Sequence, residues 1–254
     1  MSEATPALET PRAVLRETSI AFGVVTVLAW ALTRISAPPF EEYVPLAIAA
    51  LLLLTAVELA QRRPGGLAAH GLSLAGLLEP ASEASRGLGA ATELLHALRR
   101  TLRPALREAG VGLLIAAVIF PPFVWGFGLW HAPTRAFALA WPDDPLGYLA
   151  SQLVVIGLPE EAFFRGYLQS RLAKVFSART RLLGVTLSLG ALLAQAALFA
   201  LIHFVVDLDP QRLAVFFPGL LFGWLRAWRG GIGAAITLHA LSNLLSDVLA
   251  RSWL

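Results

Sequence analysis

Seven long runs of apolar residues divide this chain, and polar or charged segments separate them. They are about Ile20–Leu32, Val44–Ala60, Ala109–Trp130, Leu146–Leu172, Leu182–Val206, Leu213–Trp228 and Ile232–Leu249. A helix needs about 20 mostly apolar residues to cross a membrane, so the third, fifth and seventh runs qualify directly, while the first and sixth are short. The pattern predicts an all-α polytopic membrane protein with about seven, and between six and eight, transmembrane helices. An eighth span or a re-entrant piece would lie in residues 66–80.

Two local patterns modify this picture around the third run. Pro121-Pro122 interrupts the run and is expected to kink or break its helix. Upstream, in residues 86–107, leucine and alanine recur at steps of three and four, while the arginines fall on other faces. This spacing predicts a basic amphipathic helix at the cytoplasmic surface, where it acts as a membrane anchor or, alternatively, as a gate for substrate.

Arginine and lysine cluster in alternate loops. They lie between runs two and three, four and five, and six and seven, whereas the other loops carry Asp and Glu. The positive-inside rule therefore places the N-terminus in the cytoplasm and the C-terminus outside. The first run lacks a small-residue cleavage site after it, so we interpret it as a retained helix rather than a signal peptide.

The composition supports the membrane class. Of the 254 residues 57% are hydrophobic and only 15% are charged, which excludes an ordinary soluble domain. The net charge of +3 and the basic pI fit membrane lipid better than nucleic acid, because the arginines cluster at the ends of the runs. The absence of cysteine excludes disulfides and thiol nucleophiles. We expect one integrated membrane domain, with N-terminal helices and the amphipathic segment in residues 1–108 and a core in residues 109–254.

Two adjacent carboxylates lie inside the fourth run. Glu160 and Glu161 stand in an otherwise apolar segment, where a charge at bilayer depth costs about 2.5–3.5 kcal/mol on insertion scales. Glu161 and Arg165 are four residues apart, so they share a helix face and can form an ion pair. Glu160 is rotated by about 100° and has no local cation. Either the group staples the helix, or Glu160 faces a functional site.

Other runs contribute polar side chains as well. His203 lies near the end of the fifth run, and His239 and Asn243 lie one turn apart on one face of the seventh. Taken singly, such groups are often core histidines or hydrogen-bonding contacts between membrane helices. We interpret Gln152 and Gln195 in that structural sense.

Together these groups suffice for hydrolysis. A glutamate can take a proton from water, one histidine can orient that water or protonate a leaving amine, and the other histidine with the asparagine can stabilise an oxyanion. Zinc chemistry is the alternative, with Glu160, His203 and His239 as ligands from three separate helices. The chain has no Gly-x-Ser-x-Gly motif and no cysteine, which disfavours a covalent route.

Three motifs in this order resemble those of a known family. They are Glu160-Glu161-x-x-x-Arg165, Phe199-x-x-x-His203 and His239-x-x-x-Asn243, and the segment Phe217–Arg226 with Gly230-Gly231-Ile232 is similar too. The family is the CPBP group of intramembrane proteases, which includes the CAAX prenyl endopeptidases and the bacterial Abi proteins. The resemblance covers about Leu146 to Leu245.

The resemblance implies an endopeptidase that cleaves near the C-terminus of a membrane-associated protein. Glu160 would activate water with His203 as its partner, His239 and Asn243 would stabilise the oxyanion, and Glu161 and Arg165 would support them. It leaves a metal-free glutamic mechanism, which we favour, and a zinc-dependent one both open. The expected partners are a membrane-anchored or lipidated protein substrate and membrane lipid.

The composition also suggests a high-GC bacterium and a place in the bacterial cell membrane, where anchor-removing, myxosortase-like processing is one expected role. A non-catalytic membrane partner or a bacteriocin-immunity protein is the alternative, followed by a proton-coupled transporter. One tension remains in this topology. His203 lies near the outer end of its span, while Glu160 and His239 lie nearer mid-depth. Either the loop at Asp207–Asp209 dips into the membrane, or the site opens outside.

Overall fold

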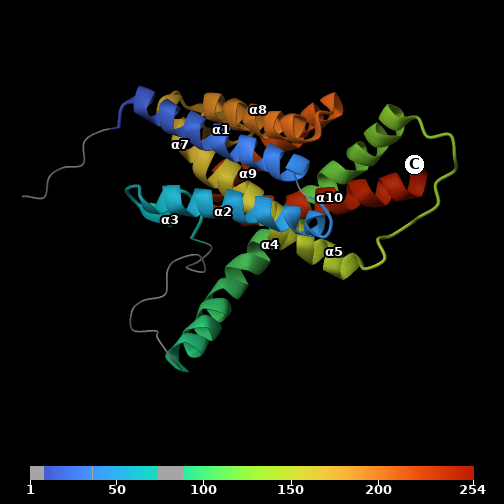
Figure 1. The fold of residues 1–254 in the computed structure, drawn as a ribbon, viewed down its shortest axis with the longest axis horizontal. Coiled ribbons are helices and arrows are strands. Elements are labelled where there is room, and N and C mark those ends of the chain that lie inside the picture. The colour runs from blue at the N-terminus through green and yellow to red at the C-terminus, as the bar shows by residue number, and fades with distance from the viewer. Residues whose placement is uncertain (1–8, 36, 74–87) are drawn as a thin grey trace, which may run out of the picture.

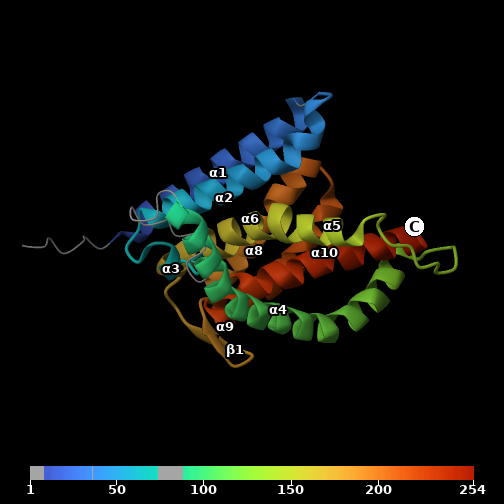
Figure 2. The same cartoon turned by 90° about the horizontal axis from the view of Figure 1, so that it is seen from below.

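The computed structural model describes residues 9–35, 37–73 and 88–254, and these are almost entirely helical. The long helices are α1 (Pro11–Ile35), α2 (Val44–Gln61), α4 (Leu88–His131), α8 (Leu189–Asp207), α9 (Phe216–Arg229) and α10 (Gly233–Trp253). Short helical turns are η1 (Phe40–Tyr43), α3 (Gly66–Ala69) and η6 (Pro210–Val215). Figure 2 shows α1 and α2 on one side of the bundle, α4 on the other, and α10 between them.

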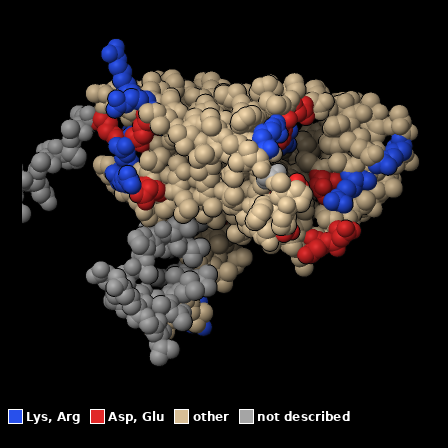
Figure 3. Space-filling view, viewed as in Figure 1, with Lys and Arg blue, Asp and Glu red and all other residues tan. Residues whose placement is uncertain are grey.

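The predicted all-α membrane class is confirmed. Five helices are long and apolar enough to cross a membrane: Pro11–Ile35, Phe40–Gln61, Thr101–His131, Leu189–Asp207 and Gly233–Trp253. The sixth predicted run forms α9, which is only 14 residues long. In Figure 3 the charged atoms gather toward the two ends of the molecule and leave a broad uncharged middle, as a membrane belt requires.

The fourth predicted run forms one continuous helical segment whose geometry changes four times. It consists of α5 (Pro145–Ser151), the π-helical turn η4 (Gln152–Gly157), α6 (Leu158–Glu161), the π-helical turn η5 (Ala162–Leu168) and α7 (Gln169–Val175). Pro159 in α6 lacks an N–H donor and crowds the preceding turn, which favours a wider turn there. Every residue of η5 is buried, so this segment forms the centre of the bundle.

Helix α4 corrects one expectation about the region around the third run and decides another between its two alternatives. The amphipathic segment is no separate surface helix, because residues 88–131 form one helix of 44 residues; Arg86 lies outside the described residues. The helix also continues through Pro121 and Pro122, and it bends rather than breaks (Figure 2). It packs mainly on α10, where Gly112 permits close approach: a Cβ there would lie 2.8 Å from the Thr237 side chain.

The predicted start of the fifth run at Leu182 is wrong, because the helix begins later in the chain. Residues 180–187 form a hairpin of β1 (Thr180–Leu182) and β2 (Val185–Leu187), and α8 starts only at Leu189. The turn residues Leu183 and Gly184 both have positive φ, at 49° and 82°, as a two-residue hairpin turn of the primed type requires. Composition alone does not separate such a hairpin from an apolar helix.

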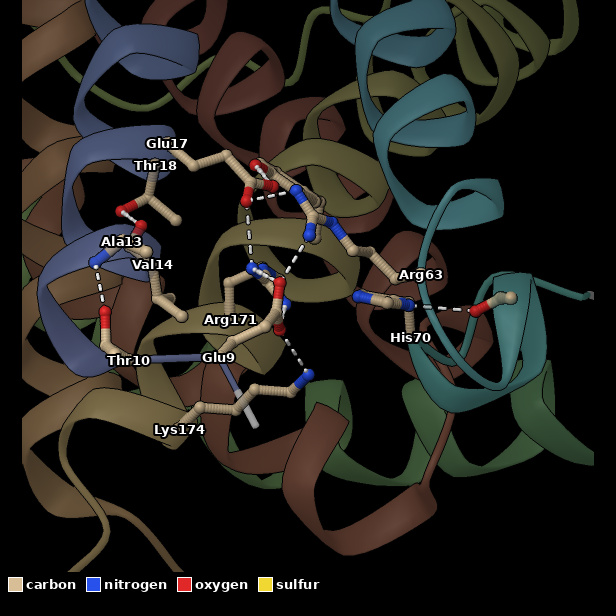
Figure 4. Close-up of polar contacts among 12 residues, drawn as sticks. Glu9, Thr10, Ala13, Val14, Glu17, Thr18, Arg63, His70, Arg171 and Lys174 are labelled. Atoms are coloured by element: carbon tan, nitrogen blue, oxygen red, sulfur yellow. Dashed lines mark hydrogen bonds and ion pairs between the residues drawn. The ribbon is translucent and has the colours of Figure 1, made fainter. Parts of the chain in front are cut away.

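A cluster of charged side chains ties the N-terminal residues to the bundle at one end (Figure 4). The fully buried Arg171 of α7 donates to Glu9 at 2.6 Å and to Glu17 at 2.9 Å, and Arg63 pairs with the same two carboxylates. Lys174 reaches Glu9 at 3.2 Å. These contacts, with the hydrogen bond from Arg171 first, lower the pKa of Glu9 from 4.5 to about 2.

We expect this cluster to make stability depend on pH. A carboxylate with a lowered folded pKa stabilises the fold above its unfolded pKa, and this contribution is lost as the pH falls from 4.5 toward 2. Glu9→Gln should lower the thermal unfolding midpoint at neutral pH, and its difference from the wild type should shrink across that acid range. Glu58→Gln, which removes an exposed pair with Arg62, is the control and should have little effect. An equal, pH-independent loss in both variants would contradict this account.

Candidate active site

All four predicted catalytic side chains line one cavity of about 1000 Å³. Glu160 comes from α6, His203 from the last turn of α8, and His239 and Asn243 from one face of α10. Residues of α4 and α9 complete the wall, among them Phe123 and Phe222. Three helices that are distant in sequence therefore present these side chains to a common space.

Glu160 is the carboxylate of this site that lacks a cation. Its Oε2 lies 3.6 Å from His239 Nε2 and 3.9 Å from His203 Nε2, which exceeds hydrogen-bonding distance in both cases. This oxygen is buried and has no hydrogen-bond partner among the described residues. An unpaired buried acceptor between two imidazoles is costly unless a reactant or water meets it.

In each of the two imidazoles, Nδ1 forms a hydrogen bond with another group of the protein. His203 Nδ1 lies 2.7 Å from the Phe199 carbonyl, and His239 Nδ1 lies 2.8 Å from Glu161 Oε1. A backbone carbonyl can only accept, and so can the carboxylate that Arg165 pairs with, so each Nδ1 carries the proton and donates it. In the neutral form each Nε2 therefore presents a lone pair toward the cavity.

Behind this layer lies the ion pair that the four-residue spacing predicts. Arg165 Nη1 donates to Glu161 Oε1 at 2.9 Å, and both side chains are fully buried. The same Glu161 oxygen accepts from His239, so one carboxylate orients an arginine and a histidine. The guanidinium also lies 4.1 Å from the centre of the Phe199 ring, a cation–π contact that helps to offset its desolvation.

Asn243 is held from the π-helical turn η4. Its Nδ2 donates to Gln152 Oε1 at 2.7 Å, and the second hydrogen of that amide stays available to the cavity. Our structural interpretation of Gln152 was therefore incomplete, because this residue lines the cavity and orients a candidate catalytic group. Gln195, in contrast, is buried and donates to the Gly219 carbonyl at 3.0 Å, a contact between helices as expected.

Aromatic rings enclose the two histidines. Phe222 stacks on His239 with ring centres 4.9 Å apart, and Phe199 meets the His203 ring edge-on at 4.5 Å. These rings fix the imidazole planes and shield them from lipid, which makes the electrostatics of the site stronger than in water.

A second cavity of about 250 Å³ lies against α1 and α2. It shares Glu160, His203, Ile156 and Arg212 with the larger cavity, and its other lining is mostly apolar. The Glu160–His203 pair therefore borders two adjacent spaces.

The donor set does not fit a ready metal site. Within residues 9–35, 37–73 and 88–254, no group of three or more His, Asp or Glu side chains is arranged to hold a metal ion. Glu161 is committed to Arg165 and His239, and Glu160 offers a single carboxylate between two imidazoles. We therefore derive no step through zinc.

Comparison with known families agrees with this geometry. Residues 141–245 match the sequence model described as type II CAAX prenyl endopeptidase Rce1-like. Over this stretch, which is less than half of the chain, the sequence is similar to the Rce1-like family. The match confirms the resemblance to the CPBP proteases over these residues, and the five long apolar helices agree with a multi-pass membrane protein. The myxosortase-like subgroup stays a prediction. No curated protein and no solved structure matches the chain.

The Rce1-like stretch contains all the singled-out side chains, but sequence reasoning missed several that shape the site. Phe222 and Arg212 line the main cavity, and neither was considered as part of it. For Phe222 a signal existed, since it lies in the segment that resembles the family. The direction in which Gln152 points depends on a π-helical turn, which an apolar pattern does not reveal.

The buried ion pair of the Rce1-like site predicts a large stability effect. Arg165→Gln should cost roughly 3–5 kcal/mol, because it leaves the Glu161 charge uncompensated in a dry interior. Glu161→Gln combined with Arg165→Gln should cost less than Arg165→Gln alone, and thermal unfolding in detergent checks both. Arg251→Gln breaks the Asp247–Arg251 pair, which has the same spacing at the surface, and should cost at most about 1 kcal/mol. Additive losses in the double variant would contradict the coupling.

Proposed function

We propose that this protein is a glutamic-type intramembrane endopeptidase that hydrolyses a peptide bond near the C-terminus of a membrane-anchored or lipidated protein. The observation that carries the proposal is the unpaired, buried Glu160 Oε2 that faces two imidazole Nε2 atoms. The separations of 3.6 and 3.9 Å leave room for a water molecule that contacts Glu160 and a histidine together.

In this mechanism Glu160 removes a proton from water, and His203 Nε2 accepts the second hydrogen of the same molecule and so orients it. The hydroxide oxygen adds to the scissile carbonyl carbon and gives a tetrahedral oxyanion. Collapse of this intermediate breaks the C–N bond, and the proton held by Glu160 passes to the leaving nitrogen. The products are a new carboxyl terminus and a free amine, and Glu160 returns to its ionised form.

His239 and Asn243 would bind the oxyanion. Because His239 Nδ1 already donates to Glu161, its Nε2 donates only when the ring is an imidazolium. Glu161 Oε1 accepts from both His239 Nδ1 and Arg165 Nη1, and this shared contact holds the His239 ring with Nε2 toward Glu160. Asn243 would supply the second donor through the amide hydrogen that Gln152 leaves free. The supporting pair thus acts on the reaction through His239.

Substitutions of Glu160 test this chemistry. Glu160→Gln keeps the shape and removes the base, so cleavage of the substrate should fall at least 10²-fold, within the range of general-base catalysis. His203→Ala should also lose most activity, Asn243→Ala should lose about 10²-fold, and a chelator should leave the wild type active. Glu58→Gln is the control for loss of a carboxylate. Full activity of Glu160→Gln would contradict the mechanism, and an unchanged biological role without cleavage would favour a non-catalytic partner.

The charge distribution supports a site that opens outside the cytoplasm. Figure 1 places the end of α8, the beginning of α5 and the C-terminus at one end of the bundle, and α3, α7 and the beginning of α1 at the other. The α8 end carries the acidic loops, and its Asp207 and Arg212 line the second cavity beside Glu160. With the basic end in the cytoplasm, the substrate would be an exported protein whose C-terminal anchor is removed in a bacterial cell membrane.

Because the chain contains no cysteine, single-cysteine labelling tests this orientation directly. Gln211→Cys lies on exposed η6, and Thr180→Cys lies on the exposed strand β1 at the opposite end. A membrane-impermeant maleimide should label Gln211→Cys in intact cells and Thr180→Cys only after permeabilisation. The reverse pattern would overturn the orientation and leave the proposed peptidase chemistry untouched.

A further inference from the structure

Arg226 near the end of α9 is a mostly buried guanidinium, and no Asp or Glu of the described residues pairs with it. Its only hydrogen bond among the described residues goes from Nη2 to Ser170 Oγ at 3.3 Å, and its Nε is buried and unpaired. Neighbouring arginines differ in this respect. Arg171 pairs with Glu9 and Glu17, and Arg229, three residues farther along α9, pairs with Glu108 at 2.6 Å. A buried cation without a counter-charge costs several kcal/mol.

Arg226 lines a pocket of about 160 Å³ between α7, the β1–β2 hairpin and α9. Arg179, Ser170 and Thr186 also line it, and no Asp or Glu does. Two guanidinium groups and two hydroxyls offer hydrogen-bond donors from several directions around a small volume. Arg side chains match phosphate oxygens with parallel N–H groups, so this donor set favours a tetrahedral oxyanion.

The position of Arg226 is fixed by a glycine. Gly71 has a φ of +67°, and a Cβ on it would lie 2.7 Å from Arg226 Cζ. Only a residue without a side chain lets the backbone approach the guanidinium so closely at this left-handed conformation. The backbone at Gly71 thus closes one side of the guanidinium, while the pocket occupies another.

We propose that this pocket binds a phosphate group, from either an anionic phospholipid headgroup or a soluble phosphate. The pocket lies between α7, the hairpin and α9, and it shares no lining residue with the candidate catalytic cavity. With the basic end in the cytoplasm, a leaflet would present phosphodiesters here. Arg226 is the inner ligand and the exposed Arg179 closes the mouth. Binding supplies the counter-charge that Arg226 lacks.

Native mass spectrometry of the full chain in detergent tests this proposal, with phosphatidylglycerol, phosphatidylcholine and inorganic phosphate as separate probes. Arg226→Gln and Arg179→Gln should each weaken binding about tenfold, the loss of one charge-assisted hydrogen-bond pair. Arg181→Gln removes the same charge from the exposed strand β1 beside Arg179 and should bind as the wild type does. Arg179 is exposed, so its variant keeps the test valid even if Arg226→Gln does not fold.

The outcomes separate the sources of the ligand. Tight phosphatidylglycerol binding that inorganic phosphate does not displace identifies a lipid headgroup, whereas binding of inorganic phosphate alone, lost in the same two variants, identifies a soluble phosphate. Equal binding in all four proteins, or an equal loss in Arg181→Gln, would mean a general surface effect and would overturn the proposal. None of these readouts depends on peptidase activity.

Discussion

The whole site depends on one charge that is removed from water. Glu161 carries its carboxylate in the driest part of the bundle, and the fold tolerates it only because Arg165 and His239 meet the same oxygen. This arrangement links two helices through a single atom and decides which way the His239 ring points. The packing of the aromatic rings then follows from these positions, because Phe199 stacks under the guanidinium and Phe222 on the imidazole.

The sequence predicted the membrane class, most helix positions and the Glu161–Arg165 ion pair, because these depend on composition and on spacings of three and four residues. It did not predict where regular geometry is interrupted. The π-helical turns on either side of Leu158–Glu161 and the hairpin before α8 depend on local backbone conformation. Those interruptions decide how Gln152 meets Asn243, which no pattern of apolar residues encodes.

The two ends of the bundle differ in how their charged side chains are placed. At the basic end Arg63 and Arg171 pair with Glu9 and Glu17, and this network anchors the first helix. Arg229 pairs with Glu108 of α4. At the other end Asp207 and Arg212 line the smaller of the two cavities that Glu160 borders. The network of paired charges therefore lies at the end that carries the beginning of α1, and the cavity that Glu160 shares with Asp207 reaches the end of α8.

Helix α4 joins the basic segment of the chain to the wall of the main cavity. At 1.5 Å per residue its 44 residues span roughly 65 Å, and the same helix bears both the arginines of its first half and Phe123 in the cavity wall. Pro104, Pro121 and Pro122 all lie inside this helix, and the last two directly precede Phe123. The residues that bend the helix therefore also set the position of this part of the cavity wall.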